Sequence, residues 1–441
     1  MRKATFKGGI HPYDGKALSK DKPTQVIMPK GDLVYPISQH IGAPAIPTVA
    51  VGDSVLTGQI IAKADGAVSA NVISSVSGKV KAIAKRLTTS GQMVESIIVE
   101  NDNEYKTIEG YGQKRDYKKL SKEEIRQYVK DAGIVGMGGA GFPTHVKLTP
   151  KDDNKIDYVL VNGAECEPYL TSDYRMMLEE PEKIIGGLKV VLSLFPNAKG
   201  IIAIEDNKID AIEKLANLVK GEQRIEVKAL KTKYPQGAER KLIYAVTKRK
   251  TNSKVLPFEA GVIVNNVDTM IAIYMAVCES TPLIRRIITV TGDAIKNSMN
   301  LNVRIGTNYE ELVEAAGGFT CEPEKVVSGG PMMGVALFDI RIPVTKTSSA
   351  LLCMKHDEVK DAEISNCIHC GRCVTACPCR VVPQMLVKAV RCGDYEAFEK
   401  LNGMECYDCG SCTYVCPAKI NLMQSLKEGK KHVAENRSKT K

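Results

Sequence analysis

Two cysteine runs of identical spacing constrain this 441-residue chain more than any other feature. In each run three cysteines lie three residues apart, and a fourth follows four residues later and precedes a proline. The runs are Cys367, Cys370, Cys373 and Cys377, and Cys406, Cys409, Cys412 and Cys416. Thiolates are soft ligands, so the pattern C-x2-C-x2-C-x3-C-P predicts a metal-binding module in the last quarter of the chain.

The spacing is typical of ferredoxins that bind two [4Fe-4S] clusters, in which three close cysteines bind one cluster and the fourth binds the other. Zinc is disfavoured, because a structural zinc site takes four ligands as spaced pairs. The expected ligand sets are Cys367, Cys370, Cys373 with Cys416, and Cys406, Cys409, Cys412 with Cys377. A helix is expected between the runs, over 381–390.

The other cysteines have no ligand spacing. Cys379 and Cys392 are either spare ligands or, as we favour, small buried thiols. We expect His369 to pack near a cluster without binding iron. Core positions are predicted for Cys278, Cys321 and Cys353.

Composition narrows the remaining possibilities. Trp is absent and aromatic residues are 5% of the chain, which argues against a base-stacking surface and hence against nucleic acid. The net charge of +10 favours an anionic nucleotide, an acidic partner or a lipid surface. Fourteen cysteines without a secretory leader predict reduced thiols. Polar residues interrupt the longest apolar stretch, 261–278, so no transmembrane helix is expected.

The hydrophobic pattern predicts a multidomain α/β and α+β protein. Short alternating strands indicate an N-terminal segment and β-sandwich over 1–115. Alternating helices and strands then indicate an α/β domain over 116–285, which begins at a capping box, Ser121 to Glu124. We expect a small α+β domain over 286–350, a helical cysteine domain over 351–426, and a frayed basic tail over 427–441, for which membrane or partner binding is the alternative.

The β-sandwich resembles lipoyl and biotinyl carrier domains over Gly52 to Gln59 and Ser77 to Val80. Those domains carry a modifiable lysine at a hairpin tip. Residues 65–75 contain no lysine, so we expect a structural or docking role instead.

A glycine-rich loop, Gly136 to Gly141, literally matches G-x-G-x-x-G. A Rossmann fingerprint must follow a strand and open a helix, whereas this run follows a helix and leads into Phe142 and Pro143. Clustered glycines still allow backbone N–H groups to approach a phosphate or a flat ring, and Lys147 supplies positive charge.

Residues 136–147 resemble the G-x-G-G-A-G-F-P-x-x-x-K flavin loop in the NADH-oxidising flavoprotein subunit of respiratory complex I. Three later segments, 162–168, 234–239 and 264–269, resemble that family's N-A-D-E-x-E-P, Y-x-x-G-E-E and V-N-N-V-E-T motifs. The resemblance implies that Glu165 and Glu167 lie at the nicotinamide side as catalytic residues. It implies FMN contacts for Gly136, Gly138, Gly139, Gly141, Lys147, Asn162, Gly237, Glu239, Asn265, Asn266 and Thr269.

Two positions depart from the family pattern: Ala164 replaces an Asp and Ala238 replaces a Glu, so polar contacts to the nucleotide are missing. For Glu165 and Glu167 the structural alternative is a solvated loop end. Cys166 has no activating base beside it and is not expected to be a nucleophile.

The whole chain resembles the RnfC family of the Rnf-type electron-transport complexes, from its 6–12 opening to a β-grasp domain of the soluble-ligand-binding type and the twin cysteine runs. The resemblance implies hydride exchange between NAD(H) and FMN, a single-electron relay through two [4Fe-4S] clusters, and ion-translocating membrane subunits as partners. An electron-carrying Fe-S subunit or ferredoxin is a further implied partner, and the implied location is peripheral, on the cytoplasmic face of the cell membrane. A non-catalytic relay and a cobalamin reductase are the alternatives.

Overall fold

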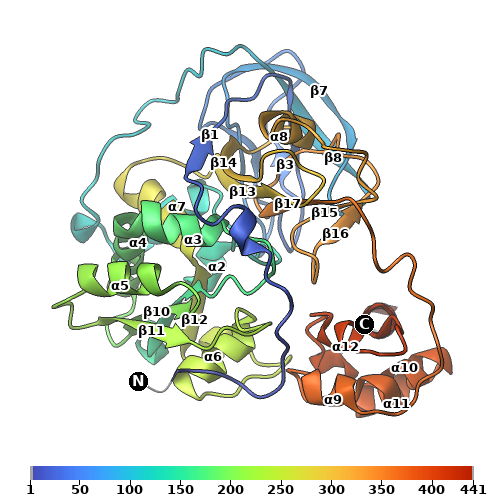
Figure 1. Ribbon diagram of the computed structural model, residues 1–441. Coiled ribbons are helices and arrows are strands. Elements are labelled where there is room, and N and C mark those ends of the chain that lie inside the picture. The colour runs from blue at the N-terminus through green and yellow to red at the C-terminus, as the bar shows by residue number, and fades with distance from the viewer. Residues whose placement is uncertain (1–2, 440–441) are drawn as a thin grey trace.

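The computed structural model describes residues 3–439 and places the domains side by side (Figure 1). The α/β domain forms one side of the molecule and the β-rich part lies above it. The cysteine domain lies below the β-rich part, at the lower right in Figure 1, and an extended connection over 355–371 leads to it.

The N-terminal β region holds a four-stranded sheet of order β2-β8-β7-β4 and a three-stranded sheet of order β3-β5-β6. Several of these strands bury consecutive residues, as β8 does over 96–99, so they contribute to the core with more than one face. Their bounds are β2 (Leu33–Pro36), β3 (Ile46–Pro47), β4 (Ser54–Val55), β5 (Ile60–Lys63), β6 (Val72–Ile73), β7 (Gly78–Leu87) and β8 (Met93–Asn101).

The α/β domain is built on a parallel sheet of order β11-β10-β9-β12, as a buried run of apolar strands alternating with helices requires. Helix α1 starts at the expected capping box, in which the Ser121 and Glu124 side chains cap each other's backbone. The strands are β9 (Tyr158–Gly163), β10 (Lys199–Glu205), β11 (Ile225–Leu230) and β12 (Val262–Asn266); the helices are η2 (Tyr117–Lys119), α1 (Lys122–Asp131), α2 (Thr144–Lys147), η3 (Asp153–Lys155), α3 (Ser172–Glu179), α4 (Pro181–Leu194), α5 (Ile209–Leu218), α6 (Glu239–Thr247), η4 (Pro257–Ala260) and α7 (Val267–Cys278).

The carboxyl edge of this parallel sheet gathers three of the motifs. The segment 164–168 leaves β9, the loop 231–238 leaves β11, and α7 begins directly after Asn266 at the end of β12. Ligands of open α/β sheets bind outside the carboxyl ends of the strands, so the topology places these motifs where a ligand site is expected.

The α+β domain holds a six-stranded sheet of order β1-β14-β13-β17-β15-β16. Its predicted limits are wrong at both ends. An edge strand comes from the N-terminal segment, and β17 continues to Met354 because it pairs with β13 and β15. The elements are β1 (Thr24–Val26), β13 (Arg285–Thr291), β14 (Met299–Arg304), α8 (Tyr309–Ala315), β15 (Lys325–Ser328), β16 (Val335–Leu337) and β17 (Ala350–Met354).

The cysteine domain is helical, and its last helix corrects the expected frayed tail of 427–441. Helix α13 runs to Lys439, buries Leu426 and Val433 against α10, and places the Lys430 ammonium 3.0 Å from the Cys406 carbonyl oxygen. The last two residues of the predicted tail, 440–441, lie outside the described residues. The apolar spacing of its buried face outweighs the basic composition. The helices are α9 (Arg372–Ala376), α10 (Pro383–Arg391), α11 (Tyr395–Lys400), η5 (Gly403–Glu405), α12 (Ser411–Tyr414) and α13 (Leu422–Lys439).

Residues 3–16, which we call the N-terminal arm, cross the gap between the α/β and cysteine domains (Figure 1). The Ile10 amide donates to the Tyr234 carbonyl at 2.8 Å, and the Gly9 amide donates to the Ala376 carbonyl at 2.7 Å. The arm ends at η1 (Lys16–Leu18). It therefore joins the flavin-type motifs to the cysteine domain, a role that the sequence did not reveal.

Across residues 3–439, none of the helices has both the length and the apolar character to cross a membrane.

Candidate functional site

The four complex I-like motifs meet at one end of the α/β domain. The Met137 amide donates to the Thr269 hydroxyl at 3.0 Å, which joins the glycine loop to α7. The Asn162 side-chain amide donates to the Gly237 carbonyl at 2.9 Å, which joins the second motif to the third. Lys147 donates to the Val264 carbonyl at 2.8 Å and lies 3.7 Å from the Glu239 carboxylate. The fold thus brings together the residues for which FMN contacts were predicted.

The glycine loop has two positions that require glycine and one that faces open space. Gly138 has φ +92°, and a Cβ there would lie 2.9 Å from the Asn266 amide nitrogen. Gly141 has φ +73° and lies against the backbone of Gln39 from the β region. A Cβ on Gly139 would meet nothing within 4 Å. The loop therefore leaves room beside Gly139 while its neighbours hold it in place.

Among residues 3–439, three buried residues that belong to the four motifs have side-chain polar atoms without a hydrogen-bond partner. Both amide atoms of Asn265 and both of Gln236 are unsatisfied although the two residues are 2% and 0% exposed, and the Thr144 hydroxyl is also unsatisfied. Unsatisfied buried polar groups cost about 1–3 kcal/mol each, and buried polar groups in native proteins are mostly paired. The edge of an isoalloxazine offers both donors and acceptors, so this donor set fits FMN.

The sequence analysis did not single out Gln236, because only the tyrosine, the glycine and the glutamate of the motif 234–239 were compared with the complex I pattern. Asp173, on α3, was missed because it lies outside all four motifs. Its carboxylate accepts from the Asn266 amide at 2.6 Å, and burial together with the nearby Glu165 raises its pKa to about 7. A carboxyl that titrates near neutral pH thus contacts the glycine-loop neighbour Asn266.

Glu165 and Glu167 are half-buried residues whose carboxylates contact protein groups, so they do not form a solvated loop end. The Glu165 carboxylate accepts from the Asp173 amide at 2.7 Å, at the start of α3, and lies 3.8 Å from the ammonium of Lys16. The Glu167 carboxylate accepts from the amides of Met332 at 2.7 Å and Met333 at 3.0 Å, and burial raises its pKa. Each carboxylate therefore has protein partners, and a contact with nicotinamide stays a prediction.

Cys166, between the two acids, does not resemble a nucleophile in the structure either. Its sulfur accepts from the Gly237 amide at 3.2 Å, and burial raises the pKa of the thiol far above its usual range. The neighbouring Ala164 contributes its carbonyl oxygen, which accepts from the Lys208 ammonium at 2.8 Å.

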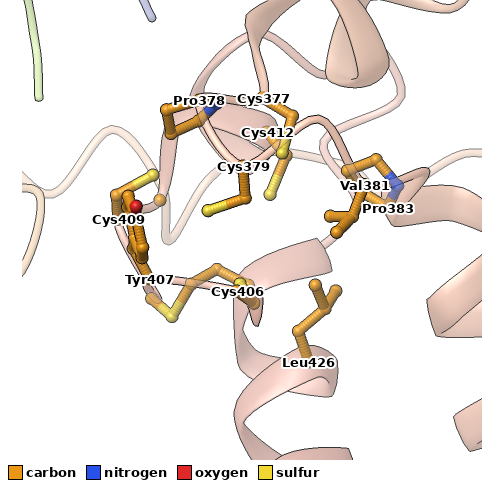
Figure 2. A pocket seen from close by; sticks show the side chains of 12 residues that line it. Cys377, Pro378, Cys379, Val381, Pro383, Cys406, Tyr407, Cys409, Cys412 and Leu426 are labelled. Carbon is orange, nitrogen blue, oxygen red and sulfur yellow. The ribbon is translucent and has the colours of Figure 1, made fainter. Parts of the chain in front are cut away.

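The eight cysteines of the two runs lie around two cavities, and each cavity combines three cysteines of one run with the last cysteine of the other. We call the first the flavin-side cavity; Cys377, Cys406, Cys409 and Cys412 line it (Figure 2). The second, the distal cavity, has a volume of about 400 Å³ and is lined by Cys367, Cys370, Cys373 and Cys416. This arrangement is the one that the ferredoxin spacing predicts.

The cysteines surround these cavities without converging on one point. Within residues 3–439, no three His, Cys, Asp or Glu side chains lie close enough to hold a single metal ion. A four-iron cluster takes one thiolate per iron atom, so its ligands stand farther apart than those of one zinc ion. The donor set and its spread therefore fit iron-sulfur clusters.

The remaining cysteines follow their predictions in part. Cys278 and Cys353 are buried, whereas Cys321 is exposed, which corrects the core position predicted for it. Cys321 lies in the loop between α8 and β15, whose polar neighbours keep it at the surface. His369 lines the distal cavity.

The flavin-side cavity adjoins the α/β domain. The Tyr234 hydroxyl donates to the Cys409 carbonyl at 2.8 Å. Arg240 pairs with Glu405 at 2.5 Å and its guanidinium stacks on the Tyr407 ring, 4.2 Å from the ring centre. Tyr234 belongs to the third complex I-like motif, so one side chain spans from the candidate flavin site to the cysteine cavity.

Fold and site together define a flavin and iron-sulfur type of electron-transfer protein. Family models agree on the domains: a Nuo51 FMN-binding domain matches residues 129–275, an RnfC barrel sandwich hybrid domain matches 4–104, and an SLBB domain matches 287–336. The chain belongs to the RnfC family of the ion-translocating ferredoxin:NAD+ oxidoreductase complexes.

Two relatives carry this assignment. The chain is 44% identical to the RnfC-type component of the Na+-translocating ferredoxin:NAD+ oxidoreductase complex of Acetobacterium woodii, over 100% of this chain and 99% of the relative. It is 45% identical to the corresponding component of the proton-translocating complex of Clostridium ljungdahlii, over 87% of this chain and 83% of the relative.

Solved structures show the same fold at low identity. Crystal structures of an NAD+-reducing [NiFe]-hydrogenase match with a TM-score of 0.50 and 19% identity in the air-oxidised state and 0.51 and 18% in the H2-reduced state. The matches cover 64% and 71% of this chain, and 55% and 62% of the hydrogenase chains.

Proposed function

We propose that this chain is the peripheral NAD(H)-linked subunit of a membrane complex that couples ferredoxin and NAD+ to ion transport. FMN, when bound, takes a hydride from a nicotinamide and releases single electrons, which [4Fe-4S] clusters carry onward. The membrane subunits, an electron-carrying Fe-S subunit or ferredoxin, and a position on the cytoplasmic face belong to this proposal.

The residues that would hold FMN are those that meet at the carboxyl edge of the sheet. Asn265 and Gln236 offer unpaired amides, the loop around Gly139 offers backbone N–H groups and free space, and Lys147 offers positive charge for an anionic group. Thr269 and Asn162 hold the loop and the third motif in position.

The contact between Tyr234 and Cys409 carries the proposal, because it brings the candidate flavin site against a cysteine cavity within one chain. The same contact suggests the order in which electrons would pass through the two cavities. The cavity of Cys409 stands next to the flavin domain, and the distal cavity, opposite in the cysteine domain, would pass electrons to or from a partner.

Anaerobically prepared protein tests this order. We expect about eight iron atoms and one FMN per chain, with NADH bleaching the flavin and reducing both clusters. In Cys370→Ser, NADH should still reduce the flavin-side cluster. In Cys409→Ser, NADH should leave the distal cluster oxidised although dithionite reduces it. Reduction of the distal cluster by NADH in Cys409→Ser contradicts the order.

The non-catalytic relay remains a second candidate, favoured by the two backbone amides that donate to the Glu167 carboxylate. In that case NADH does not bleach the flavin of the wild-type chain, and reduced ferredoxin alone reduces the clusters.

A further inference from the structure

Five cysteines line the flavin-side cavity, one more than a [4Fe-4S] cluster binds. The fifth is Cys379, whose sulfur turns into the space shared by the sulfur atoms of Cys377, Cys409 and Cys412 (Figure 2). Cys379 lies outside the repeated spacing, and the proposed function gives it no task.

The chain itself offers a comparison for this position. In the second run the residue that follows the Cys-Pro pair is Ala418, which lines the distal cavity at the place that Cys379 has in the flavin-side cavity. The two halves of the repeat thus differ by one thiol at a position that faces a cavity.

A tight turn keeps Cys379 beside Cys377. The Arg380 amide donates to the Cys377 carbonyl at 3.3 Å, and Pro378 occupies the second position of this turn, where its fixed φ is favourable. Both thiols line the same cavity (Figure 2). The turn therefore presents two sulfur atoms, two residues apart in the chain, to one cluster-sized group of cysteines.

We propose that Cys379 is an exchangeable ligand of the cluster in the flavin-side cavity and can take the place of Cys377. In the exchange the Cys379 sulfur forms a bond to iron, the bond from Cys377 breaks, and the thiol proton of Cys379 passes to Cys377. No electron is gained or lost. The inference rests on the proposed function, because it requires a cluster in this cavity.

Iron content and the electron paramagnetic resonance spectrum of each cluster test the exchange. Cys377→Ala should keep about eight iron atoms and both spectra, and Cys377→Ala/Cys379→Ala should keep about four iron atoms and only the distal spectrum. The matched control is Cys416→Ala combined with Cys392→Ala, because Cys392 is the fifth cysteine of the distal cavity. This double variant should lose the distal cluster, since Ala418 has no thiol that could bind iron in place of Cys416. Equal loss of iron from the single and double Cys377 variants overturns the proposal, whereas a wild-type chain without iron overturns the proposed function instead.

A second measurement does not depend on the folding of the Cys377 variant. Wild-type protein and Cys379→Ala, both loaded, are challenged with an iron chelator. The flavin-side cluster should be lost faster from Cys379→Ala, since no second thiol recaptures the released iron, while Cys392→Ala should match the wild type at that cluster. Equal rates of loss for Cys379→Ala and the wild type overturn the proposal.

Discussion

Asn265 allows a test in which one substitution moves protein stability and flavin affinity in opposite directions. Both amide atoms are buried and have no hydrogen-bond partner in the part of the chain that the structure describes, and a buried unsatisfied group costs about 1–3 kcal/mol. Asn265→Leu removes that penalty at similar shape. We expect the flavin-free protein to gain about 1–3 kcal/mol, which for a domain of this size raises Tm by about 2–4 °C per kcal/mol.

The same substitution should weaken FMN binding, because the amide no longer finds its partners on the ring. A loss of about 1–3 kcal/mol lowers the affinity roughly 5- to 150-fold. Thermal melting of flavin-free protein and fluorescence titration with FMN measure the two effects.

Asn300→Leu is the matched control. Asn300 is fully buried in β14, and its amide group donates to the Ser19 carbonyl and accepts from Thr171 and Thr289 hydroxyls. This variant should melt at a lower temperature and bind FMN as the wild type does. A lower Tm for flavin-free Asn265→Leu, or an unchanged FMN affinity, refutes the reasoning.

Three further predictions concern the loop, the pH dependence and the domain contact. Gly138→Ala should destabilise flavin-free protein by about 1–2 kcal/mol in urea unfolding because of its positive φ, whereas Gly139→Ala should leave that stability unchanged and weaken FMN binding. Burial lowers the pKa of Lys346 to about 7, so between about pH 7 and the ordinary pKa of 10.5 the unfolded chain binds one more proton than the folded chain. The free energy of unfolding should therefore rise with pH across that window. Urea unfolding at pH 7 and pH 9 should show this rise for the wild type but not for Lys346→Met. Arg240→Ala should speed proteolysis of the connection 355–371, since its ion pair to Glu405 in the cysteine domain is lost. The control Arg437→Ala should not, because its partner Glu399 lies in the same domain. Equal cleavage rates for the two variants would mean that Arg240 does not hold the domains together.

The features that could be predicted from the sequence are those that depend on the spacing of residues close together in the chain. The capping box of α1 and two of the four strands of the parallel sheet, β9 and β10, follow from patterns a few residues long, and the structure has them. The grouping of the cysteines around two cavities agrees with the expected ligand sets, and cluster binding stays a prediction. The convergence of the four flavin motifs came from the resemblance to complex I, and their mutual contacts agree with it.

Long-range contacts were beyond the sequence. Nothing near Lys16 indicates that its ammonium lies beside Glu165, and nothing near Glu167 indicates the Met332 amide, because both contacts join residues far apart in the chain, the second pair 165 residues apart. The orphaned amide of Gln236 is visible only when burial is known. The helix at the end of the chain was not predicted, because the basic composition of this segment was taken to indicate a frayed end. The spacing of Leu426 and Val433, which lie on its buried face, was not considered.

The arm that joins the two domains has a consequence for biosynthesis. Gly9 and its partner Ala376 are 376 − 9 = 367 residues apart in the chain, so this contact forms only after the domains between them have been synthesised. This docking step involves the turn at Cys377, whose backbone lies against Gly8. Iron delivery and the closing of the arm concern the same few residues, so maturation of the cofactor and completion of the fold are expected to occur together.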